Sequence, residues 1–173
     1  MAVVPPPAVL DAVADAVERL DVPGARVTRR EQWHLTLQFL GNRVELDPVA
    51  EALAALAVGP ATVRLGDYGG FPRERRARVL WLGVVQGGPF LAQLVAAVGA
   101  LLGPLGYSPE ERDYHPHLTL ARWKAPADLR ETVAALEAGP LGPAWTVEEV
   151  VLFESVTKPT GAEHAERARF RLR

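Results

Sequence analysis

The sequence predicts an α+β fold made of two similar halves, residues 1–86 and 87–173 of a single domain. Segments with apolar residues at helical spacing alternate with short strand-forming segments, and the order helix, strand, helix, strand, strand occurs twice. The tetrapeptide His-Leu-Thr-Leu stands on the leading strand of each half. If the halves pair about a pseudo-two-fold axis, two mainly antiparallel sheets face a central cleft, with helices on the outer faces. A bilobal architecture of two α-β-α-β-β units is therefore expected.

Proline and glycine mark the element boundaries, since Pro favours the first helical turn and Gly-Pro pairs end helices. In the first half we expect a short strand at 2–4, helices at 5–20 and 47–58, and strands at 33–40, 61–68 and 78–85. In the second half we expect helices at 89–102 and 127–138, and strands at 115–122, 145–154 and 168–172.

Composition excludes several classes of protein. The chain has no Cys, which rules out a disulfide framework, a thiolate nucleophile and a cysteine-bound metal. A net charge of −2 argues against binding nucleic acid through bulk positive charge, so any such contact must be local. The N-terminal stretch lacks the basic residues of a signal peptide, and the apolar stretch 89–103 is shorter than the roughly 20 residues of a membrane span. We expect a cytoplasmic monomer with no membrane contact.

The repeated tetrapeptide carries the chemistry. It comprises His34 to Leu37 and His117 to Leu120, so that the two histidines are 83 residues apart. Because side chains i and i+2 of a strand share a face, each His lies beside the Thr that follows it, about 6.6 Å along the strand. An isolated strand His is usually a structural residue. Its duplication with Thr at the same offset favours a functional site instead.

Two imidazoles facing one phosphate-sized space predict acid–base chemistry on a phosphate ester. One neutral imidazole can take a proton from the attacking oxygen while one imidazolium gives a proton to the leaving oxygen. This mechanism needs no metal or other cofactor. The sequence is nearly symmetric between His34 and His117, so it leaves their roles open. His115 and His117 could also be read as a metal pair, but no further ligand motif accompanies them.

The motifs WHLTLQFLG and YHPHLTLAR, the segment GGFPRERRARVLWLGV and the closing VVLFES resemble the two-histidine (2H) phosphoesterase superfamily. The similarity is to its LigT-like RNA 2′,3′-cyclic phosphodiesterases, historically called 2′-5′ RNA ligases, and covers most of the chain. It implies a bilobal α+β fold whose motif strands line a central cleft. It also implies hydrolysis of a 2′,3′-cyclic phosphate, at an RNA 3′ end or on a nucleoside, to a 2′-phosphomonoester.

The resemblance further implies residue roles. His34 would be the proton donor and His117 the proton acceptor, with Thr36, Thr119 and Arg122 holding the phosphate. Strict strand alternation places Arg122 on the face opposite His117 unless the strand bends or bulges. His164 stands where the family commonly has an aromatic residue, which leaves the substrate contacts on that side open.

Further residues are candidates for RNA contact. Phe39 and Trp123, just past each motif, could stack on bases, although aromatic residues on strands more often belong to the core. Phe71 could also stack on a base. The loop after Phe71 carries Arg73, Arg75 and Arg76, which suit a nucleic-acid backbone but also suit a solvated hairpin tip. Three other functions stay open: a reversible 2′-5′ RNA ligase, a phosphodiesterase for small cyclic nucleotides, and a non-catalytic module that binds RNA ends.

Overall fold

The computed structural model describes residues 1–41, 44–108, 113–136, 138–158 and 161–173. Its helices are α1 (Pro7–Glu18), α2 (Leu46–Leu53), α3 (Gly88–Leu102) and α4 (Arg130–Ala135), with short 3-10 turns η1 (Arg30–Gln32), η2 (Glu74–Arg76) and η3 (Gly103–Leu105). Its strands are β1 (Ala2–Val3), β2 (Arg26–Val27), β3 (Leu35–Thr36), β4 (Ala61–Phe71), β5 (Ala77–Gln86), β6 (Leu118–Ala127), β7 (Pro140–Val147), β8 (Glu149–Lys158) and β9 (Gly161–Arg171).

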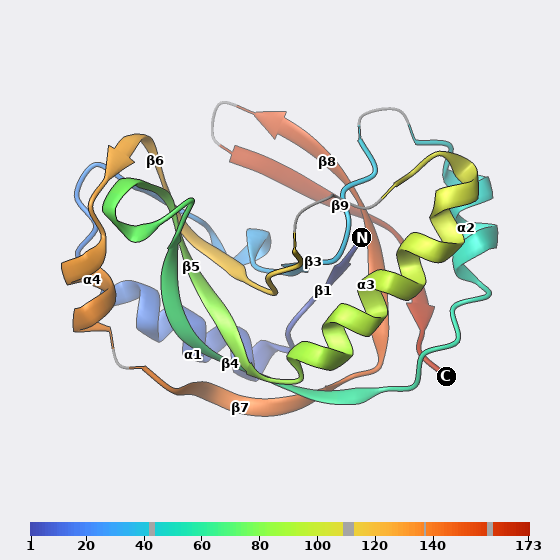
Figure 1. Cartoon of the computed structure of the whole chain (residues 1–173), viewed down its shortest axis with the longest axis horizontal. Helices are drawn as coiled ribbons and strands as arrows, with labels where there is room; N and C mark the ends of the chain where they lie inside the picture. The colour runs from blue at the N-terminus through green and yellow to red at the C-terminus, as the bar shows by residue number, and fades with distance from the viewer. Residues whose placement is uncertain (42–43, 109–112, 137, 159–160) are drawn as a thin grey trace.

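The described strands form two antiparallel sheets, which confirms the predicted fold class (Figure 1). One sheet has the order β3-β1-β8-β9 and the other the order β2-β6-β5-β4-β7. Each sheet takes strands from both halves of the sequence, because β8 and β9 join β1 while β6 joins β5. The boundary near residue 86 therefore does not divide the chain between the sheets, and the two motif strands, β3 and β6, lie in different sheets.

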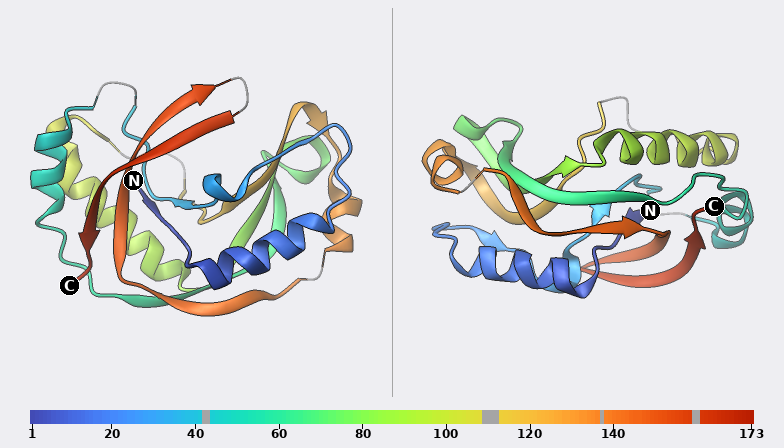
Figure 2. Two further views of the ribbon diagram at one scale, coloured as in Figure 1. Left: turned by 180° about the vertical axis from the view of Figure 1, so that it is seen from behind. Right: turned by 90° about the horizontal axis from the view of Figure 1, so that it is seen from below.

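Helices cover the outside of this arrangement. The apolar side of α1 buries Val9 and Val13 completely, and this helix packs along β7, as Figure 2 shows. The α1–β7 contact is close: a Cβ atom on Gly142 would lie 2.9 Å from Ala12 Cβ. Glycine at position 142 therefore permits the observed spacing of helix and strand.

Helix α3 packs against α2 and buries Leu91, Leu94, Val98 and Leu102 completely. It continues into η3, so the stretch Gly88–Leu105 reaches 18 residues, slightly more than the sequence indicated. By length and composition alone this stretch is sufficient to cross a membrane. Its four leucine and valine side chains named above nevertheless lie in the protein core.

The first motif strand is shorter than predicted. Residues 33–40 were expected to form one strand, but only Leu35–Thr36 pair regularly as β3. The partner, β1, has two residues before the chain enters the proline run at 5–7, so the ladder has no further partner residues. Further hydrogen bonds extend the contact: the Met1 carbonyl accepts from Leu37 N and Gln38 N, and the Met1 amine donates to the Gln38 carbonyl.

The strand expected at 145–154 is two strands. β7 ends at Val147 in one sheet, and β8 begins at Glu149 in the other, so the chain changes sheets at Glu148. β9 also begins earlier than the expected residue 168, because it pairs with β8 along its whole length. Its charged residues form ion pairs with β8, for example Arg167 with Glu154, and the apolar alternation of a half-buried strand is absent there.

Candidate active site

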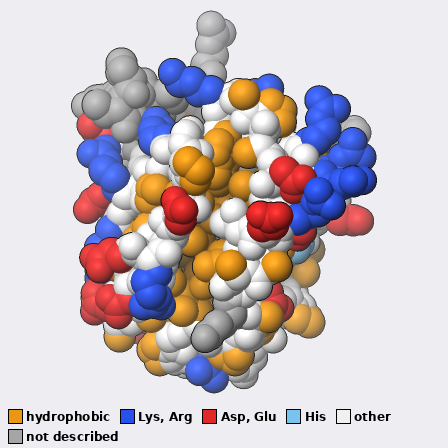
Figure 3. Space-filling model, turned by 90° about the vertical axis from the view of Figure 1, so that its left-hand side faces the viewer, with side chains coloured by type: hydrophobic (Ala, Val, Ile, Leu, Met, Phe, Trp, Pro, Cys, Tyr) orange, Lys and Arg blue, Asp and Glu red, His pale blue; other side chains and the backbone are white. Residues whose placement is uncertain are grey.

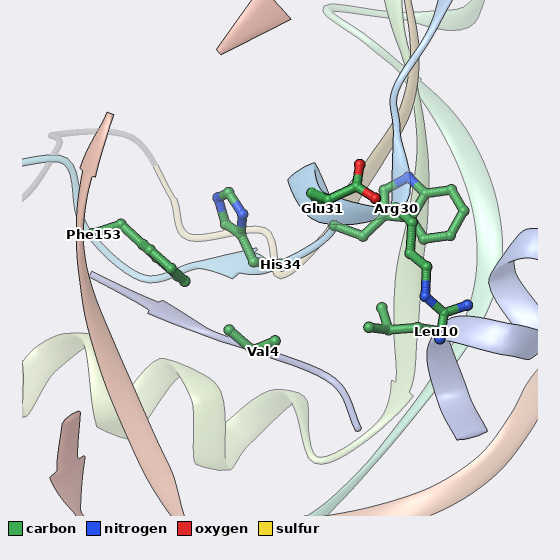
Figure 4. A pocket seen from close by; sticks show the side chains of 7 residues that line it. Val4, Leu10, Arg30, Glu31, His34 and Phe153 are labelled. Atoms are coloured by element: carbon green, nitrogen blue, oxygen red, sulfur yellow. The ribbon is translucent and has the colours of Figure 1, made fainter. Parts of the chain in front are cut away.

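His34 lies immediately before β3, at the rim of a cavity of about 260 Å³ (Figure 4). The imidazole points away from Val4 and Leu10, two apolar side chains that also line the cavity. Phe153, from β8, lies beside it with a ring-centroid distance of 5.8 Å. His34 is thus partly enclosed by the sheet to which β3 belongs.

This enclosure changes the proton affinity of His34. Burial, followed by the positive charges of His164, the N-terminal amine and His117, lowers the pKa of His34 from 6.5 to about 4. The contribution of His117 places the two motif histidines within electrostatic reach of each other across the sheets. His34 is therefore a neutral imidazole at neutral pH.

A third histidine adjoins His34. The ring of His164, on β9, meets the His34 ring edge to face, with centroids 4.9 Å apart. Its Nδ1 atom is hydrogen-bonded to Ser155 Oγ at 2.8 Å, which fixes the ring orientation. Burial lowers the pKa of His164 as well. His164, where the resemblance led us to expect an aromatic residue, thus lies directly against a predicted catalytic residue.

His117 lies immediately before β6. Its Nδ1 donates a hydrogen bond to the backbone carbonyl of His115 at 2.7 Å, which leaves Nε2 as the proton-accepting atom of the neutral ring. Phe71, at the end of β4, packs edge to face on this imidazole with centroids 4.9 Å apart. Trp81, on β5, packs against both Phe71 and His115. The aromatic wall and the carbonyl together hold His117 in one orientation.

A β-bulge brings Arg122 to the face of Thr119. Trp81 pairs with Thr119 and Leu80 with Ala121, so Leu120 is an extra residue in β6. The side-chain alternation shifts by one there, and Arg122 Nη2 donates to Thr119 Oγ1 at 3.3 Å. Strict strand alternation predicts Arg122 on the face opposite His117 unless the strand bends or bulges, and β6 has such a bulge. On the other motif strand, Thr36 is partly buried and pairs with Ala2.

Hydrogen bonds through Thr28 connect the two motif strands. Trp33, which precedes His34, donates from Nε1 to Thr28 Oγ1 at 2.9 Å. The same hydroxyl donates to the carbonyls of Thr119 and Leu120, at 2.6 and 2.9 Å. Thr28 is 7% exposed, so these bonds are shielded from water. One buried side chain thus joins the residue before His34 to the backbone of the bulge after His117.

The predicted RNA-contact residues lie in different surroundings. Phe71 belongs to the site, whereas Phe39 is 67% exposed on the segment after β3 and is not a core residue. The arginines of the β4–β5 turn are all exposed: Arg73, Arg75 and Arg76. Figure 3 shows Lys and Arg side chains gathered along the edge of the molecule where this turn lies. Their positive charge is partly balanced, since Asp128 lies near Arg75 and has a lowered pKa, chiefly through its hydrogen bonds with Arg130.

Sequence reasoning missed several residues of this site. Thr28, Phe153 and Trp81 were not among the predicted site residues, although Phe153 lies in VVLFES and Trp81 in GGFPRERRARVLWLGV. Their roles arise from pairing between distant segments. His164 was identifiable as one of only four histidines in the chain. Its contact with His34 depends on the β8–β9 pairing, which places it opposite Ser155.

Comparison with known proteins is consistent with this geometry. A family model described as the 2′-5′ RNA ligase superfamily matches residues 5–159. The chain belongs to this superfamily. Among curated members, a protein of Aeropyrum pernix is 36% identical over 126 residues, which cover 70% of each chain. One of Thermus thermophilus is 36% identical over 152 residues, which cover 82% of this chain and 73% of the other. Both are named RNA 2′,3′-cyclic phosphodiesterase.

Solved structures of the superfamily share the fold. The crystal structure of TT0787 from Thermus thermophilus superposes with a TM-score of 0.81 and 31% identity, covering 99% of this chain and 95% of the other. LigT of E. coli, in its complex with 3′-AMP, gives a TM-score of 0.78 at 24% identity, with the same coverage. The two-sheet architecture is therefore the architecture of LigT-like proteins.

Proposed function

We propose that this protein hydrolyses RNA-terminal 2′,3′-cyclic phosphates to 2′-phosphomonoesters by acid–base catalysis between His34 and His117, without a metal ion. The curated relatives at 30 to 36% identity are named RNA 2′,3′-cyclic phosphodiesterases, which supports this enzyme class. The observation that carries the mechanism is the placement of the two motif histidines just before β3 and β6, strands of different sheets, with the charge of His117 contributing to the lowered pKa of His34. A nucleoside 2′,3′-cyclic phosphate would be the minimal substrate.

In the first half of the reaction, a water molecule attacks the phosphorus and His117 takes its proton. The hydrogen bond from His117 Nδ1 to the His115 carbonyl supports this role, because it places the ring proton on Nδ1 and makes Nε2 the basic nitrogen of the neutral imidazole. The hydroxyls of Thr36 and Thr119 donate to the non-bridging oxygens. The Arg122 guanidinium, which already contacts Thr119, balances the charge that develops on those oxygens.

In the second half, the bond between phosphorus and the 3′ oxygen breaks, and His34 protonates that oxygen. His34 must therefore carry a proton in this step, although burial lowers its pKa to about 4. An anionic diester beside the ring favours the imidazolium form and opposes the effect of burial. His34 thus acquires its proton together with the substrate. Proton exchange with solvent returns both histidines to their starting states.

The proposal is tested with a nucleoside 2′,3′-cyclic phosphate in the presence of EDTA. We expect hydrolysis to continue, and to fall by about 10² to 10⁴-fold in His34→Ala and His117→Ala. His115→Ala is the matched control, since it removes an imidazole from the same segment but keeps the carbonyl that holds His117. Its activity should stay within about tenfold of wild type, on the order of a single lost contact.

The products distinguish the alternatives. A 2′-monoester supports release of the 3′ oxygen and the assigned roles, whereas a 3′-monoester would overturn them. Loss of activity on chelation would reject the metal-independent mechanism. Saturable binding of the cyclic phosphate without any product would instead favour a module that binds RNA ends. Three further points need assays of their own. They are the alternative of ligation in the reverse direction, and the predictions of a monomeric state and a cytoplasmic location.

A further inference from the structure

A second cavity, of about 580 Å³, lies at the β2–β6 edge, and we call it the β2–β6 groove. It is lined by residues 23–26, before and within β2, and 122–127, in β6. Three of the lining residues are cations, Arg26, Arg122 and Lys124, and one is the aromatic Trp123. All the others are Pro, Gly or Ala, so the groove has positive charge and no acidic residue.

The two arginines of the groove have no carboxylate partner among the described residues. Arg26 and Arg122 are directly opposite each other in the antiparallel ladder, so both side chains leave the same face of the sheet. Partial burial and the positive charge of Arg26 lower the pKa of Arg122. Within the described part of the chain, neither arginine forms an ion pair. Like charges held opposite each other are unfavourable, and an anion between them removes this repulsion.

The groove is continuous with the proposed phosphate site through Arg122. This side chain lines the groove and also donates to Thr119 Oγ1. Trp123 is fixed next to it by a hydrogen bond from Nε1 to the Pro23 carbonyl at 3.1 Å. A positively charged track beside a fixed aromatic ring is the arrangement by which proteins hold single-stranded nucleic acid, with phosphates on the cations and bases on the ring.

We propose that the β2–β6 groove binds the backbone of single-stranded RNA on the 5′ side of the reacting cyclic phosphate, with a phosphodiester between Arg26, Arg122 and Lys124. The inference rests on the proposed function, because it takes the terminal phosphate to lie at Thr119. It adds a substrate preference: an RNA chain with a cyclic end should be a better substrate than a nucleoside with the same end. The turn carrying Arg75 and Arg76 is the less favourable path, since the acidic Glu74 lies within it and Asp128 lies near Arg75.

The experiment compares a nucleoside 2′,3′-cyclic phosphate with a single-stranded RNA of about five nucleotides that has the same terminal nucleotide and cyclic end. For Arg26→Gln and Lys124→Gln, we expect kcat/KM on the RNA to fall about tenfold each, as for one lost phosphate contact. Hydrolysis of the nucleoside should change less than about twofold, within the scatter of unrelated surface substitutions. Arg171→Gln is the matched control, because it removes an exposed cation from the β9 end of the other sheet. It should affect neither substrate.

Salt dependence gives a second readout. The slope of log kcat/KM for the RNA against log salt concentration should decrease in magnitude by about 0.7 for each lost phosphate contact. Equal effects of Arg26→Gln on both substrates, or no effect on either, would overturn the proposal. The proposal would also be overturned if kcat/KM on the RNA falls in the double variant Arg75→Gln, Arg76→Gln but not in the groove variants.

Failure of the proposed function gives a different pattern, in which the wild-type protein hydrolyses neither substrate. In that case, fluorescence anisotropy with the same RNA still tests the groove. Binding that weakens about tenfold in Arg26→Gln but not in Arg171→Gln supports it. If Arg26→Gln, Arg171→Gln and wild type bind the RNA with equal affinity, the groove proposal is rejected.

Discussion

His34 combines two requirements that oppose each other. In the proposed mechanism His34 must be charged to donate a proton, yet its surroundings favour the neutral ring, since burial and three neighbouring positive groups lower its pKa to about 4. His117 has the complementary arrangement, with one nitrogen committed to a carbonyl and the other available as an acceptor. The pair thus differs in environment although the surrounding tetrapeptides are identical.

His164 should contribute to this difference. Its ring contacts His34, and its charge is the second-largest cause of the lowered pKa of His34. In His164→Gln we expect the pKa of His34 to rise above about 4 but to stay below 6.5, because burial remains. An NMR titration of the ring resonances measures the change. Ser155→Ala, which keeps the His164 imidazole, is the control and should change the pKa of His34 less. An unchanged His34 pKa in His164→Gln would contradict the expectation.

The two motif strands depend on connections that neither strand provides by itself. β3 has only two regularly paired residues, and β6 is interrupted by the bulge at Leu120. Thr28 joins them by accepting from the Trp33 indole and donating to the carbonyls of Thr119 and Leu120. We infer that Thr28 is a positioning residue for both His–Thr pairs.

Substitution of Thr28 by Val tests this role. Val keeps the shape but removes the hydroxyl, which leaves the buried Trp33 N–H without its acceptor and should lower the free energy of unfolding by about 1 to 3 kcal/mol. Misalignment of the reacting groups should lower kcat about tenfold or more, with a smaller change in KM. Thr28→Ser restores the hydroxyl and should recover most of kcat. Equal kcat in the Val and Ser variants would show that Thr28 only stabilises the fold.

At the scale of the whole molecule, the pKa of His34 links the site to stability. The unfolded chain binds a proton at His34 below about pH 6.5, whereas the folded protein does so only below about pH 4. The unfolded state therefore binds more protons between these values, and stability falls as the pH decreases through this interval. The shift corresponds to a loss of up to about 3 kcal/mol.

Denaturant unfolding at pH 7 and pH 4.5, for wild type and His34→Gln, measures this loss. We expect wild type to lose more stability than the variant over the interval, because the variant has no proton to bind at position 34. Parallel decreases in the two proteins would show that His34 is not the group responsible.

The sequence by itself determined the elements whose signals are local. Apolar spacing and Gly-Pro boundaries predicted α1, α3 and the β4–β5 hairpin, and the repeated His-Leu-Thr-Leu predicted which side chains share a face. These features follow from the period of a helix or a strand, which a few neighbouring residues define.

Only the tertiary structure decided which strands of each sequence half join which of the two sheets. The run across Glu148 contains no turn residue, so nothing local indicates that β7 and β8 belong to different sheets. The bulge that turns Arg122 toward Thr119, the Thr28 connection and the opposition of Arg26 to Arg122 likewise require partners from remote parts of the chain. Strand pairing is set by contacts between distant segments, and local periodicity cannot specify which segments meet.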